Sequence, residues 1–116
     1  MTINLSRGGV YLVEFPNIDF VTWKPRPVLL VQNPSVRGPY PDVLVAAITS
    51  STETEGPTRL LVEIRSPEGR SMGLLTDSVI ALDNLATIPE SRFRRQLGTC
   101  PVMSQVGRVL RQILSL

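Results

Sequence analysis

The sequence predicts a mainly β fold with one α-helix: a small, strongly curved antiparallel sheet or partly closed barrel, with an amphipathic helix at its C-terminal end. Short apolar runs alternate with turn residues, including 10 prolines and 8 glycines, which is typical of many short strands. After Pro101 the apolar spacing becomes helical. With 116 residues, 42% of them hydrophobic, we expect a single domain spanning residues 1–116.

Three strands are expected in the first half of the chain. Val10–Phe15 is β-branched and aromatic and stops at a proline. Pro27–Asn33 is continuously apolar in its middle, which predicts burial on both faces. Asp42–Thr49 follows a turn-rich segment. Residues 16–25 are expected to form a long loop between the first two strands.

The second half is expected to hold shorter strands. Thr58–Arg65 alternates between apolar and polar residues, which predicts a strand with one solvent-facing side. Leu74–Leu82 and Ala86–Ile88 are interpreted as two strands, separated by the turn signal Asp83-Asn84. Pro89–Arg95 is expected to form a helical turn with proline at its first position.

The C-terminal segment carries a clear helical stripe. Its apolar residues recur at the spacing of one helix face: Val102, Val106, Val109, Leu110, Ile113 and Leu116. We expect this helix to pack on the sheet, although Gly107 costs about 1 kcal/mol relative to alanine. Five strands and one helix leave sheet edges to cover, so a homodimer is expected.

Composition excludes several kinds of chemistry. The chain has no histidine, so no histidine can act as a general base, as a nucleophile or as a metal ligand. Cys100 is the only cysteine, which excludes an intramolecular disulfide and a thiolate zinc site and fits a reducing cytosol. With no dense carboxylate cluster we expect no metal and no other cofactor. The absence of a leader or a membrane-length apolar run predicts a cytoplasmic protein with no membrane partner.

Basic residues give a weak preference for anionic partners. The net charge is only +2, and Lys24 is the sole lysine. Arginine presents a planar fork that matches phosphate. A bias towards arginine codons explains the same excess, so composition alone does not decide between the two.

Three places bring reactive polar groups to the end of an apolar strand. Arg26 lies between two prolines, which restrict its backbone and aim its guanidinium; a rigid strand entry with a solvated arginine is the alternative. Thr49-Ser50-Ser51 places hydroxyls at the exit of the third expected strand, where capping a turn is their default role. If the second and third strands pair antiparallel with Arg26 beside Thr49, the two share one pocket. Asp83-Asn84 is the third place and on its own is a turn signal.

These same residues carry a family resemblance. Arg7–Val13, Lys24–Asn33 and Val43–Ser50, in that order, resemble the MazF/PemK family of bacterial toxin endoribonucleases. Shorter pieces of the family pattern follow in the right order: Pro57-Thr58, Asp77–Ile80, Thr87-Ile88, Ser91-Arg92 and Leu97-Gly98. The resemblance therefore covers nearly the whole chain.

The resemblance implies an SH3-like barrel with a C-terminal helix, assembled as a homodimer. It implies sequence-specific, metal-independent cleavage of single-stranded RNA, with mRNA as the target of this toxin class. The ribose 2′-hydroxyl would be the nucleophile, leaving a 2′,3′-cyclic phosphate and a 5′-hydroxyl. Arg26 would match the family's catalytic arginine and Thr49 its catalytic threonine, and Asp83 falls where some members place an acidic group implicated in catalysis.

The chemistry of these residue types suits that reaction. An arginine is a poor base at neutral pH unless its pKa is strongly perturbed, so we assign Arg26 chiefly to stabilising the pentavalent phosphoryl group, and a second role as an acid stays open. Thr49 is assigned to positioning a phosphate oxygen or the 2′-hydroxyl. Which group takes the proton stays open.

The residues around this pair are expected to bind RNA or an antitoxin. Trp23 can stack on an unpaired base, a contact of roughly 1–3 kcal/mol. Packing of this loop on the dimer interface is the alternative. The resemblance adds a cognate antitoxin with a short acidic, partly disordered tail, for which Phe20 and Trp23 are the expected contacts. The full set of expected RNA-binding residues is Trp23, Lys24, Ser50, Asn84 and Arg92.

The chain also departs from the family pattern. Gly9 stands where members commonly have an acidic residue after Arg7-Gly8. Ala86 stands where a Gln-x-Arg arrangement commonly supplies an arginine. That loss implies compensation by a nearby arginine such as Arg92, an altered cleavage preference, or weak activity.

Two other functions fit the same fold. The first is a topoisomerase-poisoning toxin on the same scaffold. Such toxins carry a characteristic Trp-Gly-Ile end, whereas this chain stops at Ile113–Leu116, which argues against this alternative. A non-catalytic SH3-like module would bind RNA or a peptide with salt-dependent affinity and release no product.

Overall fold

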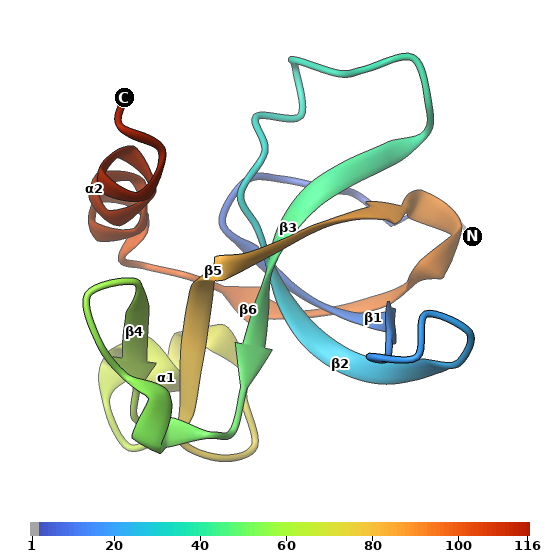
Figure 1. Cartoon of the computed structure of the whole chain (residues 1–116). Coiled ribbons are helices and arrows are strands. Elements are labelled where there is room, and N and C mark those ends of the chain that lie inside the picture. Colours follow the sequence, from blue (N-terminus) through green and yellow to red (C-terminus); the bar gives the residue numbers. More distant parts are fainter. Residues whose placement is uncertain (1–2) are drawn as a thin grey trace.

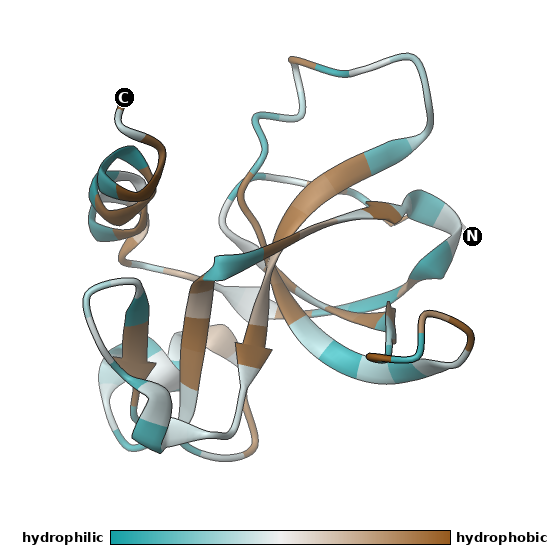
Figure 2. Cartoon of the chain, viewed as in Figure 1, coloured by the Kyte–Doolittle hydropathy of each residue, from teal (hydrophilic) through white to brown (hydrophobic). Residues whose placement is uncertain are grey.

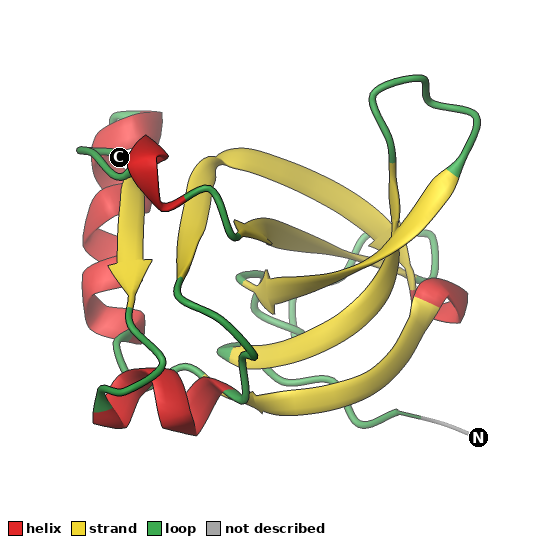
Figure 3. Ribbon diagram, turned by 90° about the horizontal axis from the view of Figure 1, so that it is seen from below, coloured by secondary structure: helices red, strands yellow, loops and turns green. Residues whose placement is uncertain are grey.

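The computed structural model describes residues 3–116, which form one six-stranded antiparallel sheet with two α-helices (Figure 1). The strands are β1 (Gly9–Pro16), β2 (Trp23–Leu30), β3 (Asp42–Thr49), β4 (Arg59–Val62), β5 (Ser78–Pro89) and β6 (Phe93–Thr99). Their order across the sheet is β4-β5-β3-β2-β1-β6. The sheet curls strongly, yet β4 and β6 remain its two edges, so it is not closed (Figure 3).

The expected mainly β fold with a C-terminal helix is confirmed. The helix, α2 (Met103–Leu114), buries Val106 and Val109 and stands beside the sheet (Figure 1). Val102, Leu110 and Ile113 of the expected apolar stripe also pack against the core, whereas Leu116 lies beyond the helix and is 84% exposed. No helix in the described part of the chain is long and apolar enough to cross a membrane.

Each face of the sheet carries its own hydrophobic cluster. Leu29 and Val31 belong to the cluster that α2 covers, whereas Val28 and Leu30 belong to the other. Successive side chains of a strand point to opposite faces, so this segment is buried on both sides, as its unbroken apolar run predicted. β3 is hydrophobic over most of its length, whereas β2 is hydrophobic mainly towards its C-terminal end (Figure 2).

The prediction of two short strands around Asp83-Asn84 was wrong, because β5 is one continuous strand with a bulge. Ala46 and Ala47 of β3 pair with Leu85 and Ala81 of β5, so the residues 82–84 have no counterparts on β3. This excess bends β5 sharply, as the path of the strand in Figure 1 shows. The polar pair thus marks a bulge within a strand rather than a turn between strands.

Other boundaries also differ from the predictions. The loop expected over residues 16–25 is shorter, since β2 begins at Trp23, and β2 ends at Leu30 rather than Asn33. Only η2 (Glu90–Arg92), a 3₁₀ turn, is helical in Pro89–Arg95. The next residues form β6, an edge strand whose polar, arginine-rich sequence hid it, so the sheet has six strands rather than five.

A short helix between β4 and β5 was not anticipated. α1 (Pro67–Met72) begins after Ser66, whose Oγ accepts a hydrogen bond from the Gly69 N–H at 3.0 Å. Serine at the N-cap followed by proline at the first helical position is a recognisable start signal. α1 ends at Gly73, which adopts a left-handed backbone with φ of 71°.

We expect opposite effects from alanine at two glycines. A Cβ on Gly73 would lie 2.0 Å from the Leu97 carbonyl oxygen, in addition to the left-handed strain. Gly73→Ala should therefore destabilise the protein by more than about 1–2 kcal/mol. Gly107 lies within α2, where the nearest atom to a Cβ is 3.6 Å away, so Gly107→Ala should stabilise by roughly 0.5–1 kcal/mol. Urea unfolding measures both, and equal stability of the two variants would contradict the described packing of α1.

Candidate active site

The pairing of β2 with β3 places Arg26 opposite Thr49. Val28 pairs with Ala47, and the same register extended by two residues on each strand brings Arg26 across from Thr49. Pro27 has no N–H to donate to the ladder, and the pairing ends beside it. The two strand ends therefore present a guanidinium and a hydroxyl side by side without being closed off by further pairing.

Two cavities adjoin this pair, and both are lined by Arg26 and Thr49. The first has a volume of about 660 Å³ and reaches the loop between β1 and β2. The second has a volume of about 480 Å³ and reaches the segment after α1 and the arginine-bearing edge of β6. Arg26 and Thr49 thus form the shared wall between two hollows, an arrangement open to an elongated ligand.

The Arg26 side chain is fixed at its base and unpaired at its tip. Its backbone pairs with Val13 of β1, and it is half-buried. The ion pairs among residues 3–116 belong to other arginines, Arg37, Arg59 and Arg94. The five N–H donors of Arg26 are therefore available to an anionic ligand.

Thr49 is the last residue of β3 and is also half-buried. Its Oγ1 accepts a hydrogen bond from the Ser51 N–H at 3.2 Å. This turn contact fixes the side chain and leaves the Thr49 hydroxyl proton free to donate.

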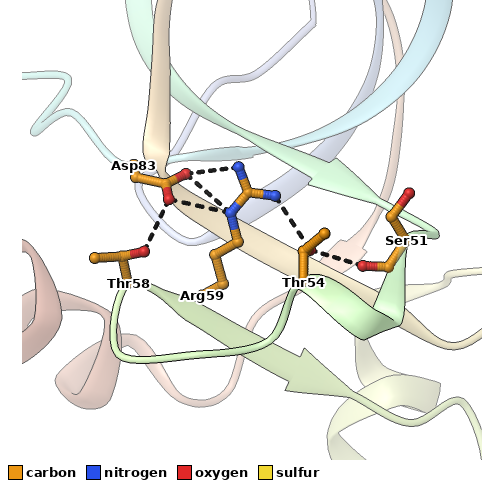
Figure 4. Close-up of polar contacts among 5 residues, drawn as sticks. All are labelled: Ser51, Thr54, Thr58, Arg59 and Asp83. Carbon is orange, nitrogen blue, oxygen red and sulfur yellow. Dashed lines mark hydrogen bonds and ion pairs between the residues drawn. The ribbon is translucent and has the colours of Figure 1, made fainter.

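Asp83 sits at the β5 bulge and is paired with Arg59 of β4 (Figure 4). Arg59 Nη2 lies 2.9 Å from Asp83 Oδ1, and Thr58 Oγ1 donates to Oδ2 at 2.8 Å. The hydrogen bond from Arg59 is the main cause that lowers the pKa of Asp83 below its ordinary value. Asp83 lines neither of the two cavities, whereas its partner Arg59 and its neighbour Asn84 both line the first.

Trp23 and Arg92 form a stacked pair beside β2. The Arg92 guanidinium lies 4.1 Å from the centroid of the indole ring. Arg92 comes from η2, so the stack joins the start of β2 to the turn before β6. The structure thus brings two of the expected RNA-binding residues together, with Trp23 38% exposed.

The loop between β1 and β2 is tightly ordered around a carboxylate. Asp19 accepts hydrogen bonds from the N–H groups of Val21 and Thr22, the bond from Thr22 being the larger of the causes that lower its pKa. Phe20 next to it has a φ of 58° and is 85% exposed. The loop therefore holds apolar side chains out into solvent.

The other residues expected to bind RNA differ in whether they line a cavity. Ser50 lines the second cavity and Asn84 the first. Lys24 lies exposed on β2 and lines neither of them.

A family comparison decides what kind of protein this is. Residues 6–114 match the family described as PemK-like, MazF-like toxin of type II toxin-antitoxin system. The chain belongs to the MazF/PemK toxin family. A comparison with curated protein sequences finds no match.

Solved structures of MazF-like toxins share this fold. Toxin MazF-mt6 of Mycobacterium tuberculosis is 25% identical with a TM-score of 0.70, over 93% of this chain and 97% of that one. An endoribonuclease from a mycobacterial species is 23% identical with a TM-score of 0.70, and the match covers 100% of this chain and 97% of that one. In the MazE–MazF complex of Deinococcus radiodurans a chain 18% identical has a TM-score of 0.72, over 97% and 96%. At these identities, the last two comparisons show that the fold is shared.

Several residues of this MazF/PemK-family site were not anticipated from the sequence. The first cavity is also lined by Asn17, Asp19, Thr54 and Arg59, and the second by Arg95. Arg59 was recognised only as an outward position of an alternating strand. Its position beside Asp83 depends on the β5 bulge, for which the local sequence holds no signal beyond a polar pair.

The Arg59–Asp83 pair makes a small, pH-dependent contribution to stability. Because the folded-state pKa of Asp83 is lowered, the contribution is present above the unfolded-state pKa of about 4 and is lost as the pH falls through the folded-state value. The Asp83 side chain is 36% exposed, so solvent screening limits the effect to about 1 kcal/mol or less.

Asp83→Asn should therefore lower the unfolding free energy more at pH 7 than at pH 2. Urea unfolding of both proteins at the two pH values measures the difference. An equal gap at both pH values would show that the carboxylate charge is not what stabilises this contact.

Proposed function

We propose that this chain is the toxin of a type II toxin–antitoxin pair, an endoribonuclease that cleaves single-stranded RNA, including mRNA, at specific sequences without a metal ion. Family membership over residues 6–114 supports the toxin assignment. The observation that carries the enzymatic assignment is the position of Arg26 opposite Thr49, where both line two adjoining cavities.

The proposed reaction is an internal transesterification of RNA. The 2′-oxygen of one ribose attacks the adjacent phosphorus and loses its proton, and the bond from phosphorus to the 5′-oxygen of the next nucleotide breaks. That leaving oxygen takes up a proton, giving a 2′,3′-cyclic phosphate and a 5′-hydroxyl. No water and no oxidant is consumed.

Arg26 and Thr49 are the proposed catalytic residues. Charge builds up on the equatorial phosphoryl oxygens in the pentavalent state, and an unpaired guanidinium fork stabilises it by charge-assisted hydrogen bonds. The Thr49 hydroxyl donates to a second phosphate oxygen or orients the 2′-hydroxyl. Removal of one such preorganised donor typically costs about 10²–10³-fold in rate.

The residues around the catalytic pair fit RNA binding. The exposed Trp23 ring under Arg92 offers a stacking surface for a base and a cation beside it. Ser50 and Asn84 supply hydrogen-bonding groups on opposite sides of the pair, one in each cavity. Lys24 extends the positive charge along β2.

The proposed partners are an antitoxin and a second copy of the chain. A related mycobacterial endoribonuclease has been solved with its cognate antitoxin, at 23% identity. Ile18, Phe20 and Val21 of the β1–β2 loop are 77% to 94% exposed, which suits docking of an antitoxin tail. The unpaired edges of the sheet suit homodimerisation. We place the protein in the cytoplasm, where its RNA substrate is found.

The decisive variants are Arg26→Ala and Thr49→Ala. Each should lower the rate of RNA cleavage by about 10² or more, because each removes a donor to the phosphoryl group. The unfolding midpoint should change little. Cleavage of a long transcript in the presence of EDTA, with mapping of product ends, measures the activity and the expected cyclic phosphate.

Arg37→Ala is the control, since Arg37 pairs with Glu90 and lines neither cavity. Full activity of both active-site variants would overturn the site assignment. Binding of RNA by the wild type without release of any product would favour a non-catalytic binding module instead.

A further inference from the structure

We propose that Arg59 is a second phosphate-binding guanidinium of this site, contacting a phosphodiester next to the one at Arg26 and Thr49, and that Asp83 is a positioning residue acting through Arg59. The inference rests on the proposed function and extends it to a residue that neither the sequence pattern nor the family comparison indicates.

Arg59 reaches the same cavity as the catalytic pair from the other side of the sheet bend. It comes from the edge strand β4, whereas Arg26 and Thr49 come from β2 and β3, yet all three line the first cavity. The strand pairing explains this. Arg59 pairs with Ala81, and Asp83 lies two residues further along β5, so the side chains of Ala81 and Asp83 point to the same face.

The Arg59 guanidinium is held by neighbours from two other elements. Its Nε donates to both carboxylate oxygens of Asp83 at 3.0 and 3.1 Å, and Nη1 donates to Thr54 Oγ1 at 3.1 Å (Figure 4). Thr58 Oγ1 donates to the same carboxylate, and Thr54 is itself fixed by a bond to the Ser51 carbonyl at 2.7 Å. The plane of the guanidinium is therefore set before RNA binds.

These contacts leave donors unused. A guanidinium has five N–H groups, of which Asp83 takes the one on Nε and Thr54 takes one on Nη1, while Nη2 lies 2.9 Å from Asp83 Oδ1 as an ion pair. Among residues 3–116, the remaining hydrogens of Nη1 and Nη2 have no protein acceptor. The side chain is 26% exposed and lines two hollows: the first cavity, which it shares with Arg26 and Thr49, and a third cavity of about 360 Å³ along β4, which those two residues do not line.

A phosphodiester is the ligand that suits two adjacent, preoriented donors. The planar fork of arginine matches two oxygens of one phosphate, and fixing the fork in advance lowers the entropic cost of binding. A single RNA strand that lies across the shared wall at Arg26 and Thr49 has to place its neighbouring phosphates in the adjoining hollows. The Arg59 side chain lines the first of these hollows.

Asp83 fits the role of a positioning residue because it is removed from the reacting groups. Its carboxylate is engaged by Arg59 and Thr58, and it lines neither cavity beside Arg26. If the Asp83 carboxylate were removed, Arg59 would keep its positive charge but lose its fixed orientation. An unpaired carboxylate, by contrast, would repel RNA.

The test is a double-mutant cycle of Arg59→Ala and Asp83→Ala in the full chain. Cleavage of a short RNA gives kcat and KM, and fluorescence polarisation gives the Kd for the same oligonucleotide with a 2′-deoxy nucleotide at the cleaved position. Arg59→Ala should raise KM and Kd by roughly tenfold, the effect of losing a hydrogen bond to a charged group, with little change in kcat. Because a phosphate contact carries no sequence information, the loss should be equal for oligonucleotides of different sequence.

Asp83→Ala should raise KM by a smaller factor, and adding it to Arg59→Ala should cause no further loss. The pH profile of kcat should be the same in Asp83→Asn and the wild type. Arg37→Ala is again the matched control, because its pair with Glu90 is similarly exposed and lines neither cavity. If Arg59→Ala unfolds, Arg59→Lys replaces it, since lysine keeps the charge and loses the fork.

Three results would overturn the inference: unchanged KM and Kd in Arg59→Ala, a loss confined to one RNA sequence, or a loss of kcat or of one pH limb in the Asp83 variants. A wild type that cleaves no RNA would instead defeat the proposed function. In that case, the Kd of the 2′-deoxy oligonucleotide for the wild type and for Arg59→Ala still tests whether Arg59 binds RNA.

Discussion

The antiparallel register of β2 against β3 is the constraint on which the rest of the molecule depends. It buries Val28 and Leu29 on opposite faces, so one pair of strands supports both hydrophobic clusters. A shift by a single residue would exchange the two faces and destroy both clusters. The same register, continued past the last ladder bond, sets Arg26 opposite Thr49. The packing that stabilises the fold therefore also fixes the spacing of the proposed catalytic groups.

Features that depend on local sequence could be predicted. The span of β3, the two-sided burial of β2 and the stripe of α2 follow from hydrophobic periodicity, which is set within a few residues. The possibility that Arg26 shares a pocket with Thr49 also followed from the sequence, because adjacent antiparallel strands bring the start of one beside the end of the other. In the structure Arg26 and Thr49 line the same two cavities.

Features that depend on tertiary pairing could not be predicted. Asp83-Asn84 is a turn signal in isolation, yet here β3 and β4 hold β5 on both sides and convert the same residues into a bulge. Four of the seven residues of β6 are polar, two of them arginines, as suits an edge strand, so periodicity does not reveal it. The start of α1 is the exception, since its serine cap and proline are a local signal.

The bulge also changes which arginine can replace the one that the family commonly has where this chain has Ala86. Ala86 follows the bulge and packs against the hydrophobic cluster of Val28 and Leu30, away from the polar bend. Arg92, the replacement that the sequence suggested, has its guanidinium face on Trp23. Arg59 lies beside the bulge and lines the first cavity, and hydrogens of its Nη1 and Nη2 remain without a protein acceptor among residues 3–116. If Arg59 binds phosphate as proposed, the cation of this part of the site comes from the strand next to β5, and Asp83 at the bend fixes its orientation.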